Sequence, residues 1–135
     1  MTKLARVQSL VLKREEFGPR SLAAIIPILR RPRPENLQVL RLINCRITAP
    51  VTRELIAALT DCSQIKVLGL VNTRMTDQAM VDLGLMLQKS NKLTELDISW
   101  NTLKPQSYAN LMAALGDNKT LLSLNLSFNR IVDTE

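Results

Sequence analysis

Histidine is absent from this chain of 135 residues, and glycine occurs only four times. Without histidine the chain cannot build a Ser-His-Asp triad, a histidine zinc site or an imidazole acid–base catalyst. The isolated glycines do not give the spacing of a phosphate-binding loop. Cys45 and Cys62 are interpreted as reduced, buried apolar side chains, because one potential bridge does not indicate a disulfide framework. We therefore expect no catalysis, cofactor, metal or small-molecule substrate.

The chain also lacks an uninterrupted apolar run of about 18 residues, the length that spans a membrane. Its first residues have neither the apolar core nor the cleavage site of a secretory signal. The composition is 46% apolar and 22% charged, with a mean hydropathy of +0.04, which is typical of a folded domain rather than a disordered chain. We expect an intracellular protein without membrane insertion, cytoplasmic by default and with the nucleus left open.

A repeat with a period of 28 residues fills most of the sequence. The pattern L-x-x-L-x-I-x-x-N-x-L starts at Leu93 and returns 28 residues later. The same step backward finds two more copies, and a step of 30 finds a fifth. Each copy has four positions that should be apolar, and all 20 are apolar, which excludes coincidence. The repeats start near Val7, Leu37, Ile65, Leu93 and Leu121.

Each repeat combines a strand signal with a helix signal. Leu96 and Ile98 alternate with polar residues, as in a short strand with one buried face. Between the strands, apolar residues recur four apart, which is one helical turn. These pairs are Ile25 and Leu29, Leu55 and Leu59, Leu83 and Leu87, and Leu111 and Leu115. Pro19, Pro50 and Pro105 precede three of the helical segments, and Asp77 is expected to cap the fourth.

This pattern resembles the leucine-rich repeat, and its length and ninth-position Asn or Cys are similar to the ribonuclease-inhibitor-like subfamily. The resemblance implies an α/β solenoid of about five repeats, an open arc with a parallel sheet on the concave face and helices on the convex face. The resemblance covers the chain from Val7 to Ile131, and residues 1–135 are expected to form a single domain. Buried Asn101 and Asn129 are expected to bond backbone groups of the turn after the strand, and Cys45 and Thr73 to do so less completely.

The two ends depart from the pattern. Glu15 stands where Asn or Cys is expected, and Pro27 interrupts the predicted helix over residues 20–30, so the first repeat is irregular. The last repeat is incomplete, because it lacks a helix after Ile131. An uncapped apolar end favours a fragment of a longer repeat protein, while docking of another chain at this end and a frayed end stay open.

The concave face is the usual binding side in this family. Trp100 and Phe128 share a repeat position and are expected to lie side by side at one rim as an interface hot spot, flanked by Glu95 and Asp97. The alternative is that the two rings only pack on each other. Arg41 and Lys13 complete the candidate protein-binding residues. The expected face comprises Val11, Lys13, Val39, Arg41, Ile43, Val67, Gly69, Val71, Glu95, Asp97, Ser99, Ser123, Asn125 and Ser127.

Positive charge is concentrated at the start of the chain. Residues 1–35 hold eight Lys or Arg and three Asp or Glu, a net charge of +5 in a total of +6. An acidic partner for the first unit would explain this charge, but solubility and protection of the sheet edge are the favoured explanation.

The resemblance favours a non-catalytic scaffold for protein–protein interaction, a subunit or fragment of a larger intracellular assembly such as a cytoskeletal or ciliary one. Alternatives are an innate-immune sensor segment and a GTPase-activating module of the nuclear-transport type, for which Arg41, Arg46 and Arg74 would be candidates. Nucleic-acid binding through the basic N-terminal unit is a weaker alternative.

Overall fold

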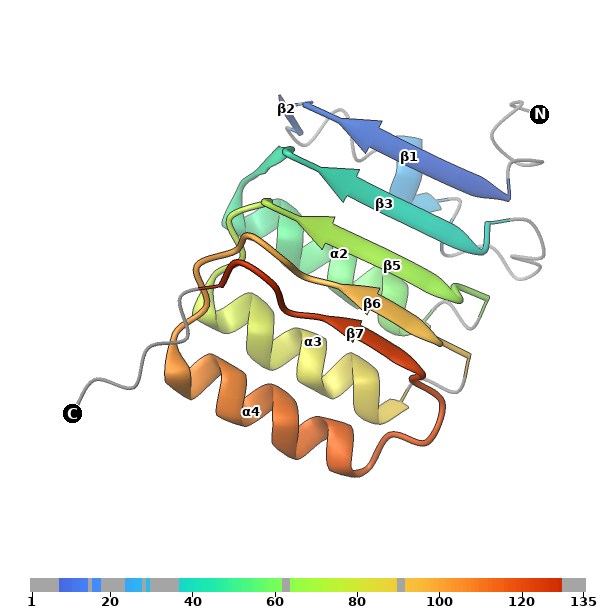
Figure 1. Ribbon diagram of the computed structural model, residues 1–135. Helices are drawn as coiled ribbons and strands as arrows, with labels where there is room; N and C mark the ends of the chain where they lie inside the picture. Colours follow the sequence, from blue (N-terminus) through green and yellow to red (C-terminus); the bar gives the residue numbers. More distant parts are fainter. Residues whose placement is uncertain are drawn as a thin grey trace.

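Five parallel strands of the described chain form one sheet in the computed structural model, and helices cover one side of it (Figure 1). The structure describes residues 8–14, 16–17, 24–27, 29, 37–61, 64–89 and 92–129. The elements are β1 (Ser9–Lys13), β2 (Glu16–Phe17), β3 (Val39–Ile43), β4 (Arg46–Ile47), α2 (Ala49–Asp61), β5 (Val67–Val71), α3 (Asp77–Lys89), β6 (Glu95–Asp97), α4 (Pro105–Gly116) and β7 (Ser123–Asn125). Residues 24–27 and 29 are also helical.

The strand order β1-β3-β5-β6-β7 follows the chain, so each strand–helix unit lies beside the next one. The pairing register matches the sequence period, because Leu40, Leu68, Leu96 and Leu124 are direct neighbours across four strands. Leu10 pairs with Leu40 across the longer step of 30 residues. Stacked leucines at equivalent positions are therefore confirmed. A short second sheet pairs β2 with β4, which the sequence did not predict.

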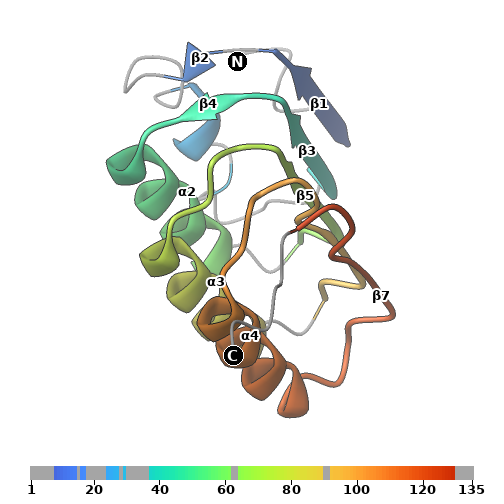
Figure 2. The ribbon, with the colours of Figure 1, turned by 60° about the vertical axis from the view of Figure 1, so that its left-hand side comes forward.

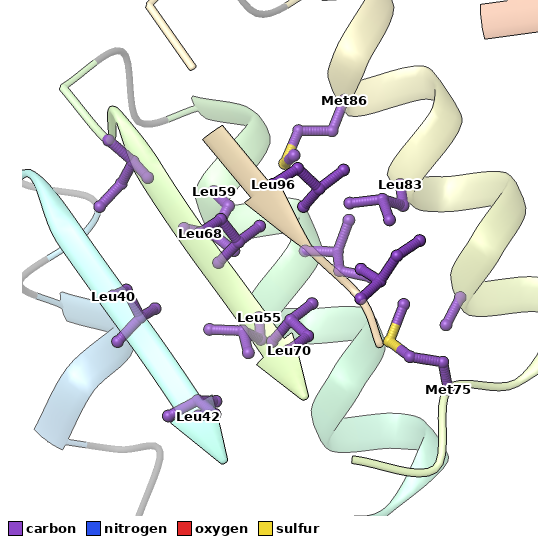
Figure 3. Packing of buried hydrophobic residues seen from close by; sticks show 14 of the residues in the cluster. Leu40, Leu42, Leu55, Leu59, Leu68, Leu70, Met75, Leu83, Met86 and Leu96 are labelled. Atoms are coloured by element: carbon purple, nitrogen blue, oxygen red, sulfur yellow. The ribbon is translucent and has the colours of Figure 1, made fainter. Parts of the chain in front are cut away.

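The strands are buried on the face that meets the helices. In β3 and β5, Leu40, Leu42, Leu68 and Leu70 are fully buried, while the flanking strand residues other than Gly69 keep some exposure. Figure 2 shows strands β1, β3, β5 and β7 on one side of the molecule and α2, α3 and α4 on the other. Figure 3 shows leucines of the sheet meeting Leu55, Leu59 and Leu83 of the helices, with methionines filling the gaps. Burying each such side chain contributes about 1.5–3 kcal/mol to the hydrophobic driving force.

The helices begin close to the predicted positions. Pro50 and Pro105 lie in the first turns of α2 and α4, where a missing N–H costs nothing. The prediction that Asp77 caps α3 is wrong, because Asp77 is the first residue of the helix. The hydroxyl of Thr76 instead accepts the N–H of Ala79 at 3.1 Å, which is the geometry of an N-terminal cap.

Asp77 links two helices rather than capping one. The buried Ser107 hydroxyl donates to Asp77 Oδ1 at 3.0 Å, and Lys104 Nζ lies 3.3 Å from Oδ2. The Ser107 hydrogen bond, followed by the Lys104 hydrogen bond, lowers the pKa of the Asp77 carboxyl below its usual 3.8. These contacts tie the start of α3 to the first turn of α4.

Several predictions lie outside the described residues. These are the turn at Glu15, Pro19 before the first helix, Cys62, most of the basic N-terminal segment, and the end of the last repeat from Ile131. The helix predicted over residues 20–30 is described only in part. No helix in the described ranges has both the length and the hydropathy to cross a membrane.

Candidate functional site

The sheet face opposite the helices, here called the open face, is the largest candidate surface. It carries alternate strand residues that are exposed or half-buried, and the expected list is correct except at Gly69 and Ser99, which are buried. Ser99 is buried, with 5% of its surface exposed. Strand β6 ends at Asp97, whose Oδ1 accepts the Ser99 N–H at 3.0 Å, so the chain has already turned inward where alternation would have placed Ser99 outside.

The turns after the strands are held by asparagine amides, as predicted, although Asn101 is buried and Asn129 only partly so. Asn101 Nδ2 donates to the carbonyls of Leu70 and Ile98 at 2.6 and 2.9 Å. Its Oδ1 accepts the Thr73 N–H at 2.9 Å. Asn129 repeats the arrangement, donating to Ile98 O at 3.0 Å and accepting the Asn101 N–H at 2.7 Å. These bonds fix the backbone that carries the rim of the open face.

Cys45 occupies the same repeat position as Asn101 and is buried, as predicted. Its thiol donates to the Leu12 carbonyl at 3.4 Å and to the Ile43 carbonyl at 3.5 Å. Both bonds are weak. Thr73 makes a similarly long bond to Leu70 O, at 3.5 Å. Thus the prediction that Cys and Thr satisfy the turn less completely than Asn is confirmed.

A row of residues with left-handed backbone lines the edge of the open face, just beyond the strand ends. We call this the rim row, and its φ angles lie between 51° and 62°. The Asn72 amide donates to Asn44 Oδ1 at 2.9 Å, which links one half of the row. Asn44 and Asn72 could have indicated this geometry from the sequence, because asparagine tolerates the left-handed region. The rim row comprises Arg14, Asn44, Asn72, Trp100 and Phe128.

The other half of the rim row is aromatic. Trp100 and Phe128 stack with ring centroids 4.2 Å apart and planes inclined by 13°. Both remain exposed, at 53% and 66%. The two rings therefore pack on each other, as the simpler interpretation expected, and they also present a joint apolar surface to solvent.

The four predicted charged residues lie on the open face or at its edge. Lys13 is exposed at the end of β1. Arg41 Nη2 on β3 lies 3.5 Å from Glu95 Oε1 on β6, and these side chains are 33% and 43% exposed. Asp97 lies on the same strand as Glu95, closer to the aromatic pair in the chain. The ion pair was not foreseen from the sequence.

The arginines considered for GTPase activation lie on different elements of the structure. Arg41 is engaged by Glu95 on the open face. Arg46 belongs to β4 in the second sheet, and Arg74 is an exposed turn residue with left-handed backbone. The described residues contain no group of three His, Cys, Asp or Glu side chains placed to hold a metal ion.

The helical side carries a groove of about 410 Å³ between the first halves of α2 and α3. Arg53 and Glu54 line it from α2, and Asp82 from α3. Gln78 donates to Asp82 Oδ1 at 3.1 Å, while Oδ2 is buried without a partner among the described residues. No aromatic side chain lines this groove, so the open face with its rim row is the stronger candidate.

Comparison with known proteins supports the repeat architecture. Residues 89–106 and 117–134 match the family described as Leucine Rich repeat. The fold is similar to a solved structure described as "Leiomodin-1 Actin-Binding Site 2 (ABS2)", with a TM-score of 0.78 and 23% sequence identity over 87% of this chain and 68% of that chain. No curated protein matches the sequence. Two segments of the chain therefore match leucine-rich repeats, within an α/β fold of parallel strands and helices.

Proposed function

We propose that this protein is a non-catalytic scaffold that binds another protein through the open face and the rim row. In this proposal the chain is a single domain of five ribonuclease-inhibitor-like repeats starting at the predicted positions, with the open face as the concave side of an arc. It serves a larger intracellular assembly, cytoskeletal or ciliary. Trp100 and Phe128 anchor the partner, and the charged residues of the face select it.

The stacked aromatic pair in left-handed backbone carries the proposal. The left-handed conformation costs an ordinary residue about 1–2 kcal/mol, and a bulky side chain there is unusual. Trp100 and Phe128 adopt it at φ values of 62° and 60°, where the equivalent residues are Arg14 in the first repeat and asparagines in the second and third. Strain combined with exposure favours a role in binding, because neither feature stabilises the fold.

Actin is the first partner to test. The solved structure with a similar fold is described as an actin-binding site, so its likeness favours a cytoskeletal protein partner. The open face suits a protein ligand, because a broad and rigid surface limits the conformational entropy lost on binding.

The test is co-sedimentation with filamentous actin and titration of monomeric actin, using the wild type and the double variant Trp100→Asn/Phe128→Asn. Asparagine suits the left-handed backbone, so the fold is retained while the aromatic surface is lost. We expect the variant to bind at least about thirtyfold more weakly, the effect of removing one hot spot of about 2 kcal/mol. Leu122→Asn is the matched control, because Leu122 is an exposed apolar residue outside the rim row.

Equal binding by the wild type and the double variant would reject the aromatic anchor. If the wild type does not bind actin, actin is excluded as the partner. The same three proteins then serve as baits in native extract, where a specific partner must be captured by the wild type and the Leu122→Asn control but not by the double variant.

A further inference from the structure

Arg41 crosses a whole strand to reach its partner. It lies on β3, its ion-pair partner Glu95 lies on β6, and β5 runs between them. The β5 residue opposite Arg41 is Gly69. A Cβ atom at Gly69 would lie 3.2 Å from Arg41 Cγ, closer than ordinary contact. The missing side chain at Gly69 therefore leaves the path along which Arg41 spans the face.

Charges on the open face are segregated by strand. The positive side chains, Lys13 and Arg41, lie on β1 and β3, and Arg14 follows β1 in the rim row. The negative side chains, Glu95 and Asp97, both lie on β6. Strand β5 between them contributes only uncharged residues. The face thus has a positive side, an apolar centre and a negative side.

The internal ion pair is weak enough for a partner to replace. Exposed pairs contribute little net stability, because water screens the attraction and both side chains lose freedom. Arg41 and Glu95 are each about one-third to two-fifths exposed, so both remain within reach of a ligand. From β1 to β6 the sheet advances three strand steps, about 14 Å, which an extended peptide covers in about four residues.

Resting on the proposed function, we infer that the open face binds an extended polypeptide segment in which acidic and basic residues are separated by an apolar spacer of about four residues. The acidic end lies against Lys13 and Arg41, and the basic end lies against Glu95 and Asp97. A nucleic acid or an anionic membrane, which carries charge of one sign, would be repelled by the carboxylates of β6. Polarity of the face therefore selects and orients the partner.

The test uses two labelled synthetic peptides of identical composition. One has an acidic block, an apolar spacer of about four residues and a basic block, and the other alternates the same charges along its length. Fluorescence anisotropy at low ionic strength measures binding to the intact protein. We expect the segregated peptide to bind about tenfold more tightly, which corresponds to two exposed charge pairs.

The decisive variant is the exchange Arg41→Glu/Glu95→Arg. It keeps an ion pair across Gly69 and an unchanged net charge, but it places opposite charges together on each side of the face. The preference for the segregated peptide should then fall below about twofold. Thermal unfolding should match the wild type, which shows that the fold is intact.

Equal binding of the two peptides by the wild type, persistence of the preference in the exchange variant, or no binding of the segregated peptide would each overturn the inference. The Trp100→Asn/Phe128→Asn variant separates this outcome from failure of the proposed function. If the aromatic anchor acts as proposed, that variant weakens both peptides equally and leaves their ratio unchanged. If the Trp100→Asn/Phe128→Asn variant binds both peptides like the wild type while the exchange variant loses the preference, the aromatic anchor is rejected and the charge polarity of the open face is retained.

Discussion

Replacing Asn101 with alanine is expected to lower the free energy of unfolding substantially, because the amide holds two turns together. Asn101 is 2% exposed. Its loss removes the 2.6 Å hydrogen bond to the Leu70 carbonyl and the 2.9 Å acceptor of the Thr73 N–H. The Ile98 carbonyl is less affected, since Asn129 also donates to it.

Two backbone groups each lose a hydrogen-bond partner, at about 1–3 kcal/mol per group, so the free energy of unfolding is expected to fall by about 2–6 kcal/mol. The total stability of such a domain is about 5–15 kcal/mol, so the loss is a large fraction of it. Urea denaturation followed by circular dichroism measures this difference. Asn110→Ala is the matched control, because Asn110 is exposed on α4, and its effect should stay within about 0.5 kcal/mol.

A third variant, Asn101→Cys, sharpens the test. Cys45 fills this position in an earlier repeat and donates weakly to a strand carbonyl. The expected order of stability is wild type, then Asn101→Cys, then Asn101→Ala. The reasoning is refuted if Asn101→Ala costs no more than Asn110→Ala, because the amide would then not be holding the turn.

Three further outcomes are expected. Trp100→Asn should change the free energy of unfolding by less than about 1 kcal/mol in urea denaturation, because relief of the left-handed strain offsets the lost stacking; a larger loss would make the aromatic pair structural. Gly69→Ala should abolish the coupling energy between Arg41 and Glu95 in a double-mutant cycle, while the free energy of unfolding changes by less than about 1 kcal/mol. Persistent coupling would mean that Arg41 does not need the space left by the missing side chain at Gly69. Because the pKa of Asp77 is lowered in the folded state, the ionised carboxylate stabilises the fold at pH values above the usual carboxyl pKa, and this stabilisation is lost as the pH falls through the lowered pKa. The difference in Tm between wild type and Asp77→Asn should therefore shrink in acid. A difference that stays constant with pH would contradict this.

The sequence predicted the strands, the helices and the stacked leucines because these depend on burial with a fixed period. A residue such as Leu96 must be buried whatever surrounds it, and its partners lie at the repeat distance. The same logic placed Asn101, since a buried amide at a turn must bond the backbone. The repeat period is thus enough to predict the structure wherever a residue type makes the same contacts in every repeat.

The predictions from the sequence are wrong where the local structure differs between repeats. Ser99 was assigned to the open face by extending strand alternation, but β6 ends two residues earlier. Thr76 rather than Asp77 caps α3, because the helix begins at Asp77, one residue earlier than the cap assignment required. The Arg41–Glu95 pair joins residues almost two repeats apart through a long side chain, a contact that no repeat spacing encodes.

Under the proposed function, folding stability and partner binding depend on two neighbouring residues with opposite surroundings. Asn101 points inward and has its amide bonded to backbone on both sides of the turn, whereas Trp100 points outward in strained backbone. The Asn101 N–H is itself held by Asn129, so the peptide bond between residues 100 and 101 is fixed from the inside. A fixed turn lets the rim carry a residue that the backbone alone would disfavour, because the cost of the left-handed conformation is met by the buried amide network. Substitutions at 101 should therefore weaken folding and binding together, whereas substitutions at 100 should weaken binding alone.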